Sequence, residues 1–285
     1  MRAGHHEVGV TSESPTVRLG LSSRPQTLTI VRGMLAGVAE PLGFDAELLD
    51  DLKTTISEAC NNVVLHAYGG EAGPMDVALF VSEDRIRVVV EDRGIGVPAT
   101  ADSAEGIGLS VIRALTETMT LAAAPDGGTR LEMTFAGQRD GRRLFAPPAA
   151  AGPIHRWAPA EDDDVVVSLS PVALLAPVLG RLARTLAAMA HFSLDRFSDV
   201  YLITDTLAAH AATAAADQRV DARLAAADRR VDLAVGPFRP GASGHLNARS
   251  SQAGAPPLTL LSDEVSIEPN GDGECLRVVI VDRRA

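Results

Sequence analysis

Apolar and polar residues alternate in some segments of the chain and recur every three or four positions in others. Residues 16–22 alternate Val and Leu with Arg, Gly and Ser, which predicts an edge strand. Pro25 then opens a helix expected over residues 26–40, and Pro41 and Gly43 are expected to end it. The first folded segment is therefore a strand followed by a helix.

A longer helix is predicted to follow from Asp45, because aspartate favours the N-cap position. Its apolar residues are spaced by three and four positions, so they form one stripe of an amphipathic helix: Leu48, Leu52, Ile56, Ala59, Val63 and Ala67. The pair Gly69-Gly70 is expected to end this helix.

The pattern up to residue 136 predicts four more strands and one short helix. The strands are expected at 75–82 and 85–91, joined as a hairpin, and at 119–123 and 129–136, with the helix at 106–118. The order strand, two helices, two strands, helix, two strands predicts an α+β fold, in which helices cover one face of a mixed sheet.

The second half of the chain repeats this order faintly. Strands are expected at 165–170, 220–225, 230–235, 258–262 and 275–281, and helices at about 171–189 and 194–215. We interpret residues 16–137 and 165–285 as duplicated domains, 1–15 as a flexible tail, and the proline- and alanine-rich residues 138–164 as a linker. The alternative to a duplication is that the alanine-rich helices of the two halves align through their composition alone.

Composition narrows the class of protein. A chain of 285 residues with 46% hydrophobic content is expected to form two globular domains. Its formal net charge of -11 disfavours nucleic acid and favours a protein partner. Cys60 and Cys275 are too few and too distant for a disulfide framework or a zinc site. No segment has the pattern of an export signal, and no apolar run reaches membrane-spanning length. These observations predict a cytoplasmic protein that does not associate with a membrane.

Three polar residues of the long predicted helix are spaced four and four, so Glu58, Asn62 and His66 share one face. An amide oxygen suits Mg²⁺, whose remaining ligands are usually phosphates and water. A glutamate one turn earlier is placed to accept a proton from a hydroxyl. The alternative is a solvated polar face, which is the commoner reason for such a triplet.

Asp92 closes a predicted strand and precedes Gly94 and Gly96. Because aspartate is unfavourable inside strands, its position indicates a turn or a ligand contact. Its carboxylate can accept a hydrogen bond from the exocyclic amine of adenine, and glycines allow close approach of the backbone. A tight Asp-Arg-Gly turn is the alternative.

Two further glycine motifs are weak when taken singly. Gly106 and Gly108 stand where a loop enters a helix, and the free N–H groups there favour phosphate, although an ordinary loop-to-helix joint has the same pattern. Thr129 follows a Gly-Gly turn into the last strand of the first half. It is placed for a direct or water-mediated contact with adenine, or for a plain β-turn.

In combination, these motifs resemble a known family. Residues 16–136 resemble the Bergerat-fold ATPase domain of histidine kinases, gyrase-type topoisomerases, Hsp90 chaperones and MutL proteins. Within that group, the phrase Ile-Ser-Glu-Ala-Cys-Asn-Asn-Val-Val-Leu-His-Ala-Tyr, residues 56–68, is most similar to the bacterial anti-sigma factor serine/threonine kinases. The short segment between Asp92 and Gly106 fits the short nucleotide lid of those kinases.

The resemblance implies ATP and Mg²⁺ as the bound groups and a role for each matching residue. Glu58 would be the general base, Asn62 would bind Mg²⁺, and Asp92 would recognise adenine. Gly94 and Gly96 would shape the adenine pocket, and Thr129 would support the adenine contact. Gly106 and Gly108 would cradle the phosphates. Leu65 stands where the family often has a basic residue, and Arg93 and Arg113 are the candidate phosphate partners.

The second domain lacks these motifs and is predicted to bind no ATP. Depending on register, Asp205 or Thr206 falls at the Glu58 position, and Ala209 or His210 at the Asn62 position. This copy would act as a built-in dimer partner or present a protein-binding face. A homodimer of the chain is the alternative to such an intramolecular pairing. The expected function is an ATP-binding anti-sigma-type serine/threonine kinase whose partners are a sigma factor, an anti-sigma-factor antagonist, or both. The alternative is a non-catalytic module that senses nucleotides.

Overall fold

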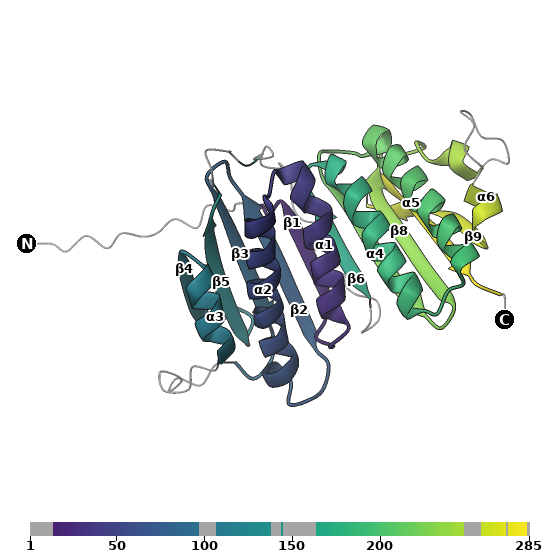
Figure 1. The fold of residues 1–285 in the computed structure, drawn as a ribbon. Helices are drawn as coiled ribbons and strands as arrows, with labels where there is room; N and C mark the ends of the chain where they lie inside the picture. The colour runs from purple at the N-terminus through teal and green to yellow at the C-terminus, as the bar shows by residue number, and fades with distance from the viewer. Residues whose placement is uncertain are drawn as a thin grey trace, which may run out of the picture.

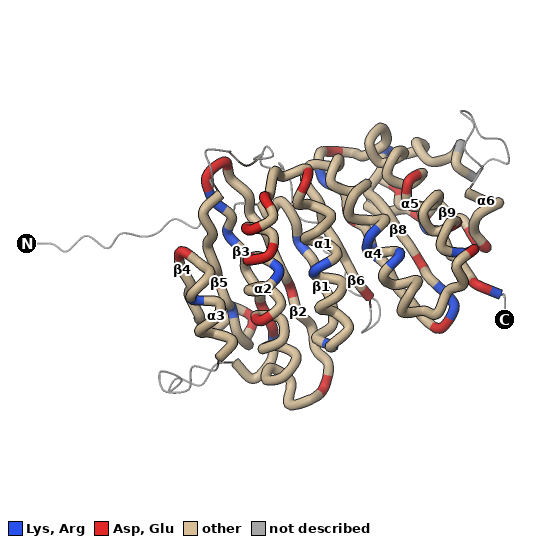
Figure 2. The backbone as a smooth tube through the Cα atoms, viewed as in Figure 1, with Lys and Arg blue, Asp and Glu red and all other residues tan. Residues whose placement is uncertain are grey.

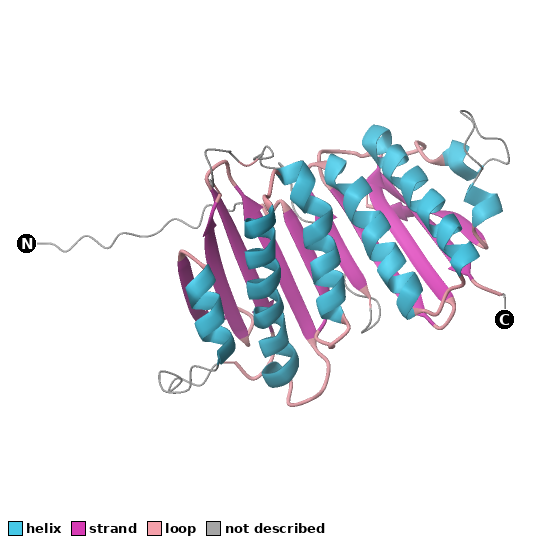
Figure 3. Ribbon diagram, in the orientation of Figure 1, coloured by secondary structure: helices cyan, strands magenta, loops and turns pink. Residues whose placement is uncertain are grey.

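A computed structural model describes residues 14–96, 107–137, 144, 164–247, 258–271 and 273–283. The expected tail and linker therefore lie almost wholly outside the described residues. The described strands form one ten-stranded sheet, and the helices lie on one of its faces (Figures 1 and 3). The predicted α+β class, with helices covering one face of a sheet, is confirmed.

The first half follows the predicted order closely. Its elements are β1 (Val17–Ser22), α1 (Thr27–Leu42), α2 (Ala46–Asn62), a π-helix (Val63–Ala67), β2 (Pro74–Val81), β3 (Arg85–Asp92), α3 (Ile107–Leu115), β4 (Thr118–Ala123) and β5 (Thr129–Ala136). The side chain of Asp45 accepts a 2.7 Å hydrogen bond from the amide of Leu48, so it caps α2 and contributes about 1 kcal/mol. Pro41 lies inside α1, which ends one residue later, before Gly43 in the left-handed conformation.

The second half contains β6 (Val165–Leu169), a 3₁₀ turn (Val172–Leu174), α4 (Leu175–Met189), α5 (Leu194–Ala214), β7 (Val220–Ala227), β8 (Arg230–Phe238), a 3₁₀ turn (Gly244–Asn247), α6 (Leu258–Leu261), β9 (Glu264–Asn270) and β10 (Gly273–Val281). The prediction of a strand at 258–262 is wrong, because this short apolar run forms a helical turn whose buried residues are Leu258 and Leu261. Strand β9 was not predicted.

The order of strands repeats on the two sides of a central seam. Counted outward from the seam, the first half runs β1, β2, β3, β5, β4 and the second runs β6, β7, β8, β10, β9. At the seam β1 pairs with β6, from Val17 opposite Leu169 to Gly20 opposite Val166. The two halves therefore share one continuous sheet, and the same topology occurs twice within it.

All the strand pairings described are antiparallel, which corrects the expectation of a mixed sheet. Alternate residues point to the helices, and on β1 these are the buried Val17, Leu19 and Leu21. Between them, Arg18 forms an ion pair of 2.9 Å with Asp76 of β2. Figure 2 shows Lys and Arg interspersed with Asp and Glu over the described elements.

Helices α1 and α4 lie side by side over the seam (Figure 1). They are in close contact at Gly37, where a Cβ atom would lie 2.9 Å from the carbonyl oxygen of Pro177. At Gly33, one turn earlier in α1, the nearest atom would be 3.8 Å away, in Thr185. The helices thus diverge from Gly37, and a hollow of about 430 Å³ lies beyond the point of divergence, with Ile30 and Leu186 in its wall.

Among the described residues, Val172–Met189 is the one helical stretch that is long and apolar enough to cross a membrane by length and composition. Half of this stretch is buried within the protein. Its buried residues, Leu182 and Leu186 among them, belong to the core.

Candidate functional site

Helix α2 places Glu58 and Asn62 one turn apart, beside the buried stripe of Ile56 and Ala59. Both polar side chains are half-buried, so they lie at the edge of the core and remain accessible. The helix does not stop at Asn62 but widens into a π-helix, a feature often found at functional sites. His66, which shares the spacing, is exposed and belongs to this π-helix.

Asp92 is buried at the end of β3, and its carboxylate is held by the backbone. One oxygen, Oδ1, accepts hydrogen bonds from the amide of Gly94 at 2.8 Å and from the amide of Thr129 at 3.2 Å. These two donors fix the orientation of the carboxylate. Register places Asp92 opposite Met75, whose side chain lies on the helical face, so the carboxylate projects toward the helices.

Three glycine positions around Asp92 permit close contacts between backbone segments. A Cβ atom on Gly128 would lie 2.6 Å from Oδ1 of Asp92, and one on Gly94 would lie 2.0 Å from the carbonyl oxygen of Ala67. Gly96 has φ 74° and would place a Cβ atom 3.3 Å from the carbonyl oxygen of Gly128. The structure therefore gathers four of the predicted residues, Asp92, Gly94, Gly96 and Thr129, into one group.

Gly108 belongs to a second group, with Glu58 and Asn62. A Cβ atom at Gly108 would lie 2.9 Å from Oε2 of Glu58 and 3.7 Å from Oδ1 of Asn62. The missing side chain leaves space beside both polar groups at the start of α3. Gly106, the other predicted phosphate-binding glycine, lies outside the described residues.

The π-helix connects the two groups. Its last residue, Ala67, accepts a 2.9 Å hydrogen bond from the amide of Ile95, which follows Gly94. Tyr68, which sequence reasoning left without a role, bonds to the same turn through the amide of Arg93. The signal for Tyr68 was weak: it is one of two tyrosines in the chain, and it is followed by glycines at 69, 70 and 73.

Donor chemistry at this place suits a magnesium nucleotide. Asp92 uses one oxygen for two backbone amides, and its other oxygen is the natural acceptor for an amine of a bound ligand. Asn62 offers an amide oxygen of the kind that Mg²⁺ accepts, and the space at Gly108 suits phosphate at the N-terminus of α3. The residues present therefore fit the nucleotide and the metal ion.

The corresponding place in the second half is built differently. The buried stripes of α2 and α5 match at a constant separation: Leu52 and Val200, like Val63 and Ala211, are 148 residues apart. This register, which sequence reasoning left open, places Thr206 at the Glu58 position and His210 at the Asn62 position.

The second half fills this place with its own side chains. His210 is buried, packs edge-on against Phe238 with ring centroids 4.8 Å apart, and lies 3.0 Å from the hydroxyl of Ser243. Glu274 stands two residues before Leu276, as Thr129 stands two residues before Leu131. Its carboxylate accepts hydrogen bonds from the amides of Gly241 and Ser243 at 2.9 and 2.6 Å. The register between β8 and β10 shifts near the end of β8. Pro237 and Phe238 therefore occupy the level of the sheet that Asp92 occupies in the first half.

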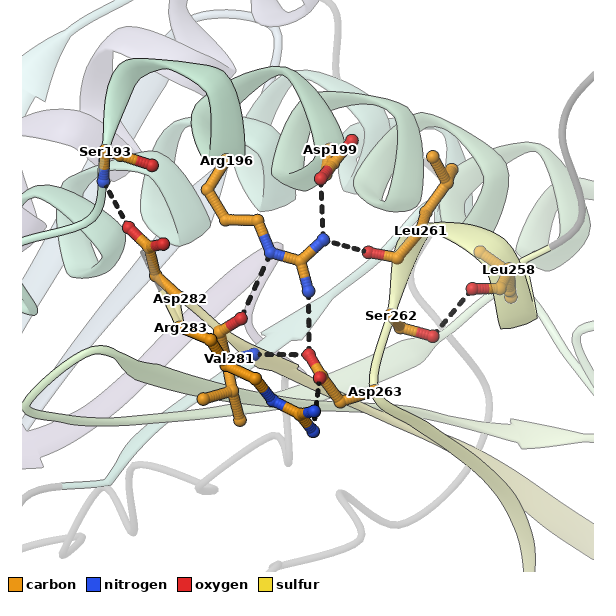
Figure 4. Close-up of polar contacts among 10 residues, drawn as sticks. All are labelled: Ser193, Arg196, Asp199, Leu258, Leu261, Ser262, Asp263, Val281, Asp282 and Arg283. Atoms are coloured by element: carbon orange, nitrogen blue, oxygen red, sulfur yellow. Dashed lines mark hydrogen bonds and ion pairs between the residues drawn. The ribbon is translucent and has the colours of Figure 1, made fainter. Parts of the chain in front are cut away.

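A separate polar cluster lies at the outer end of the second half (Figure 4). Arg196 of α5 donates to Asp199 at 2.6 Å, to Asp263 at 2.7 Å and to the carbonyl oxygens of Val281 and Leu261. These bonds tie the start of α5 to β10 and to the turn before β9. A hollow of about 470 Å³ adjoins them. Among the described residues, no three or more His, Cys, Asp or Glu side chains are grouped so that they could hold a metal ion.

Comparisons with known proteins agree with the geometry of the first half. Residues 21–135 match the model of the histidine kinase-like ATPase domain. The serine-protein kinase RsbW of Bacillus pumilus is 31% identical over 137 residues, which are 41% of this chain and 83% of that protein. RsbW of Bacillus velezensis is 40% identical over 79 residues, 27% of this chain and 49% of its own length. A solved structure, crystal form III of TP0453, covers 95% of this chain and 92% of that one at 10% identity, but a TM-score of 0.31 is too low to support an argument.

Proposed function

This chain belongs to the family of histidine kinase-like ATPases that includes the RsbW serine-protein kinases, and on that basis we propose that its first half is an ATP-dependent serine/threonine protein kinase of the anti-sigma type. The observation that carries the proposal is the carboxylate of Asp92, which two backbone amides hold by a single oxygen. A buried carboxylate fixed in this way is suited to recognise the exocyclic amine of adenine.

In the proposed reaction each residue of the first half has one role. Asn62 would hold Mg²⁺, and the ion would neutralise phosphate charge. Gly106 and Gly108 allow the backbone to contact the phosphates. Glu58 takes the proton of a serine or threonine hydroxyl. As the hydroxyl oxygen bonds to the γ-phosphorus, the bond between the γ-phosphorus and the β-phosphate oxygen breaks, and ADP is released.

The rest of the adenine site follows from the same proposal. Gly94 and Gly96 shape the adenine pocket, and Thr129 supports the adenine contact. The structural support for Thr129 is indirect, since its amide orients Asp92. Partners are a sigma factor, an anti-sigma-factor antagonist, or both, and a kinase that consumes ATP would act in the cytoplasm.

We assign the second half, residues 165–285, the role of a built-in partner without a nucleotide site. Its strands continue the sheet of the first half across β1 and β6, and α4 packs on α1. His210 and Phe238 fill the place where the first half keeps Asn62 and Asp92. One chain therefore carries a repeated fold and one competent site.

The test is phosphoryl transfer from labelled ATP with Mg²⁺ to a purified antagonist protein. We expect label on a serine or threonine of the antagonist with the wild-type chain, and loss of label with Glu58→Gln while ATP binding is kept. Glu40→Gln, an exposed glutamate of α1, is the matched control and should transfer normally. Transfer by Glu58→Gln at the wild-type rate would refute the assigned base. ATP binding without any transfer would favour the nucleotide-sensing module instead.

A further inference from the structure

Tyr68 joins three segments that border the proposed nucleotide site. Its hydroxyl donates to the carbonyl oxygen of Pro74 at 2.5 Å, at the start of β2. The same oxygen accepts the amide hydrogen of Arg93 at 2.8 Å, in the turn after β3. Tyr68 itself follows the π-helix directly. One side chain therefore connects the end of the helix that carries Asn62 to both strands beside Asp92.

The ring of Tyr68 has a defined place in this arrangement. A Cβ atom at Gly73 would lie 2.3 Å from Cε1 of the ring, so the ring rests directly on the backbone of residue 73. Burial raises the pKa of Tyr68, which keeps the hydroxyl protonated and able to donate. The position of the hydroxyl is thus set by the fold.

The Tyr68 contact and the Asp92 contact fall on neighbouring backbone amides. Arg93 donates to the hydroxyl of Tyr68, and Gly94 donates to Oδ1 of Asp92. These two amides belong to successive peptide units joined at the Cα atom of Arg93, so a change in φ or ψ of Arg93 would disturb at least one of the two hydrogen bonds. Next along the chain, Ile95 donates to Ala67, so the whole turn is held against the end of the π-helix.

From these contacts we infer that Tyr68 is a positioning residue that determines the preference of the site for adenine, by holding the turn that orients Asp92. The inference rests on the proposed function, because it assumes that Asp92 reads the base. Tyr68 acts through the Arg93–Gly94 turn, because its hydroxyl bonds to backbone atoms of Pro74 and Arg93.

The experiment measures the affinity of the full-length chain for ATP and for GTP, each with Mg²⁺. For Tyr68→Phe, we expect the Kd for ATP to rise about fivefold and the Kd for GTP to change by less than about twofold, because only adenine depends on the orientation of Asp92. The preference for ATP over GTP falls accordingly. A general loss of stability would weaken both nucleotides alike and leave this ratio unchanged.

Two variants sharpen the experiment. Gly73→Ala keeps the hydroxyl but displaces the ring, so it should lower the ATP preference as Tyr68→Phe does. Tyr201→Phe removes the only other tyrosine hydroxyl, on the outer surface of α5, and should leave the preference unchanged. If Tyr68→Phe does not fold, Gly73→Ala decides the question.

Amide hydrogen exchange provides a readout that needs no nucleotide. We expect the Arg93 amide to be protected in the wild type and in Tyr201→Phe, and to exchange at least about tenfold faster in Tyr68→Phe. An unchanged ATP preference in both Tyr68→Phe and Gly73→Ala, in a wild-type chain that binds ATP, overturns the inference alone. Failure of the wild type to bind ATP overturns the proposed function, and with it the role assigned to Tyr68 in base recognition.

Discussion

The two halves of this molecule have the same strand order and different chemistry at the corresponding place. In the first half, Asp92 at the end of β3 is held by backbone amides, and glycine at 128 allows the backbone to approach it closely. In the second half, Phe238 is fully buried at that level and packs on His210. The comparison indicates that the same topology can be kept while a few positions decide whether a site is open or filled.

The difference has a simple physical origin. The fold depends on alternating buried residues in the strands and on one apolar stripe in each helix, and both halves keep these patterns. Ligand chemistry depends on half-buried positions outside the stripe, such as Glu58 and its counterpart Thr206. Thr206 donates its hydroxyl to the carbonyl oxygen of Leu202, a contact internal to the helix. Substitutions at such positions alter the site without disturbing the core.

The largest expected effect comes from exchanging residues between the halves. Asn62→His places the second-half residue in the first-half site and removes the proposed Mg²⁺ ligand. We expect nucleotide affinity to fall on the order of 100-fold, since losing a ligand should cost at least as much as losing an outer-shell partner. Calorimetric titration with ATP and Mg²⁺ measures the change.

The reverse exchange is the control for this prediction. His210→Asn should create no second binding event, because the buried Phe238 and Ser243 still fill the space and the carboxylate of Glu274 already accepts the amides of Gly241 and Ser243. Nucleotide binding by the second half in this variant would contradict the view that the site is closed by more than one residue.

A smaller effect is expected from the Arg196 cluster, which distinguishes α5 from α2. The side chains of Arg196 and Asp263 are 20% and 17% exposed, whereas Lys53 of α2 reaches the largely exposed Asp50 only at 3.8 Å. Arg196→Leu should destabilise the second half by about 1–3 kcal/mol, because Asp263 loses a partly buried partner. Lys53→Met should change stability by less than about 0.5 kcal/mol. Denaturant midpoints compare the two variants, with unfolding of the second half monitored through hydrogen exchange of the amides in β10.

The smallest effect is a pH dependence confined to the second half. Burial alone would raise the pKa of Glu274, but hydrogen bonds from the hydroxyl and amide of Ser243 and from the amide of Gly241 outweigh it and hold the pKa below 4.5. A depressed pKa in the folded state gives stability that is present above the unfolded value and is lost as the pH falls through the folded value. The stability difference between wild type and Glu274→Gln should therefore shrink between pH 7 and pH 3. A difference that grows on acidification would contradict the assignment.

Much of the fold could be predicted from periodicity, and the failures have physical reasons. The stripe from Leu48 to Ala67 identified α2, and Asp45 identified its cap. Strand β9 was missed because it is an edge strand of mixed sequence that contains Pro269. The run at Leu258–Leu261 was mistaken for a strand because a four-residue segment with three leucines does not distinguish a helical turn from a strand.

The candidate site was predictable in its residues but not in its contacts. Asp92 and Asn62 could be named from spacing and resemblance. The bond from Thr129 to Asp92 spans 37 residues, and the register of the second half depends on burial along a whole helix, so neither is visible in a local pattern. The role of Tyr68 was missed for the same reason, because its partners Pro74 and Arg93 meet only in the folded sheet.

The central claim is that one chain binds one nucleotide, in its first half, through Asp92. Isothermal titration calorimetry of the full-length chain with ATP and Mg²⁺ tests it most directly, with Asp92→Asn as the matched variant. We predict one nucleotide bound per chain, and an affinity lower by roughly 10- to 100-fold in Asp92→Asn, the size of one hydrogen bond to a charged group. Two nucleotides per chain, none at all, or one that binds Asp92→Asn as tightly as wild type would contradict the account.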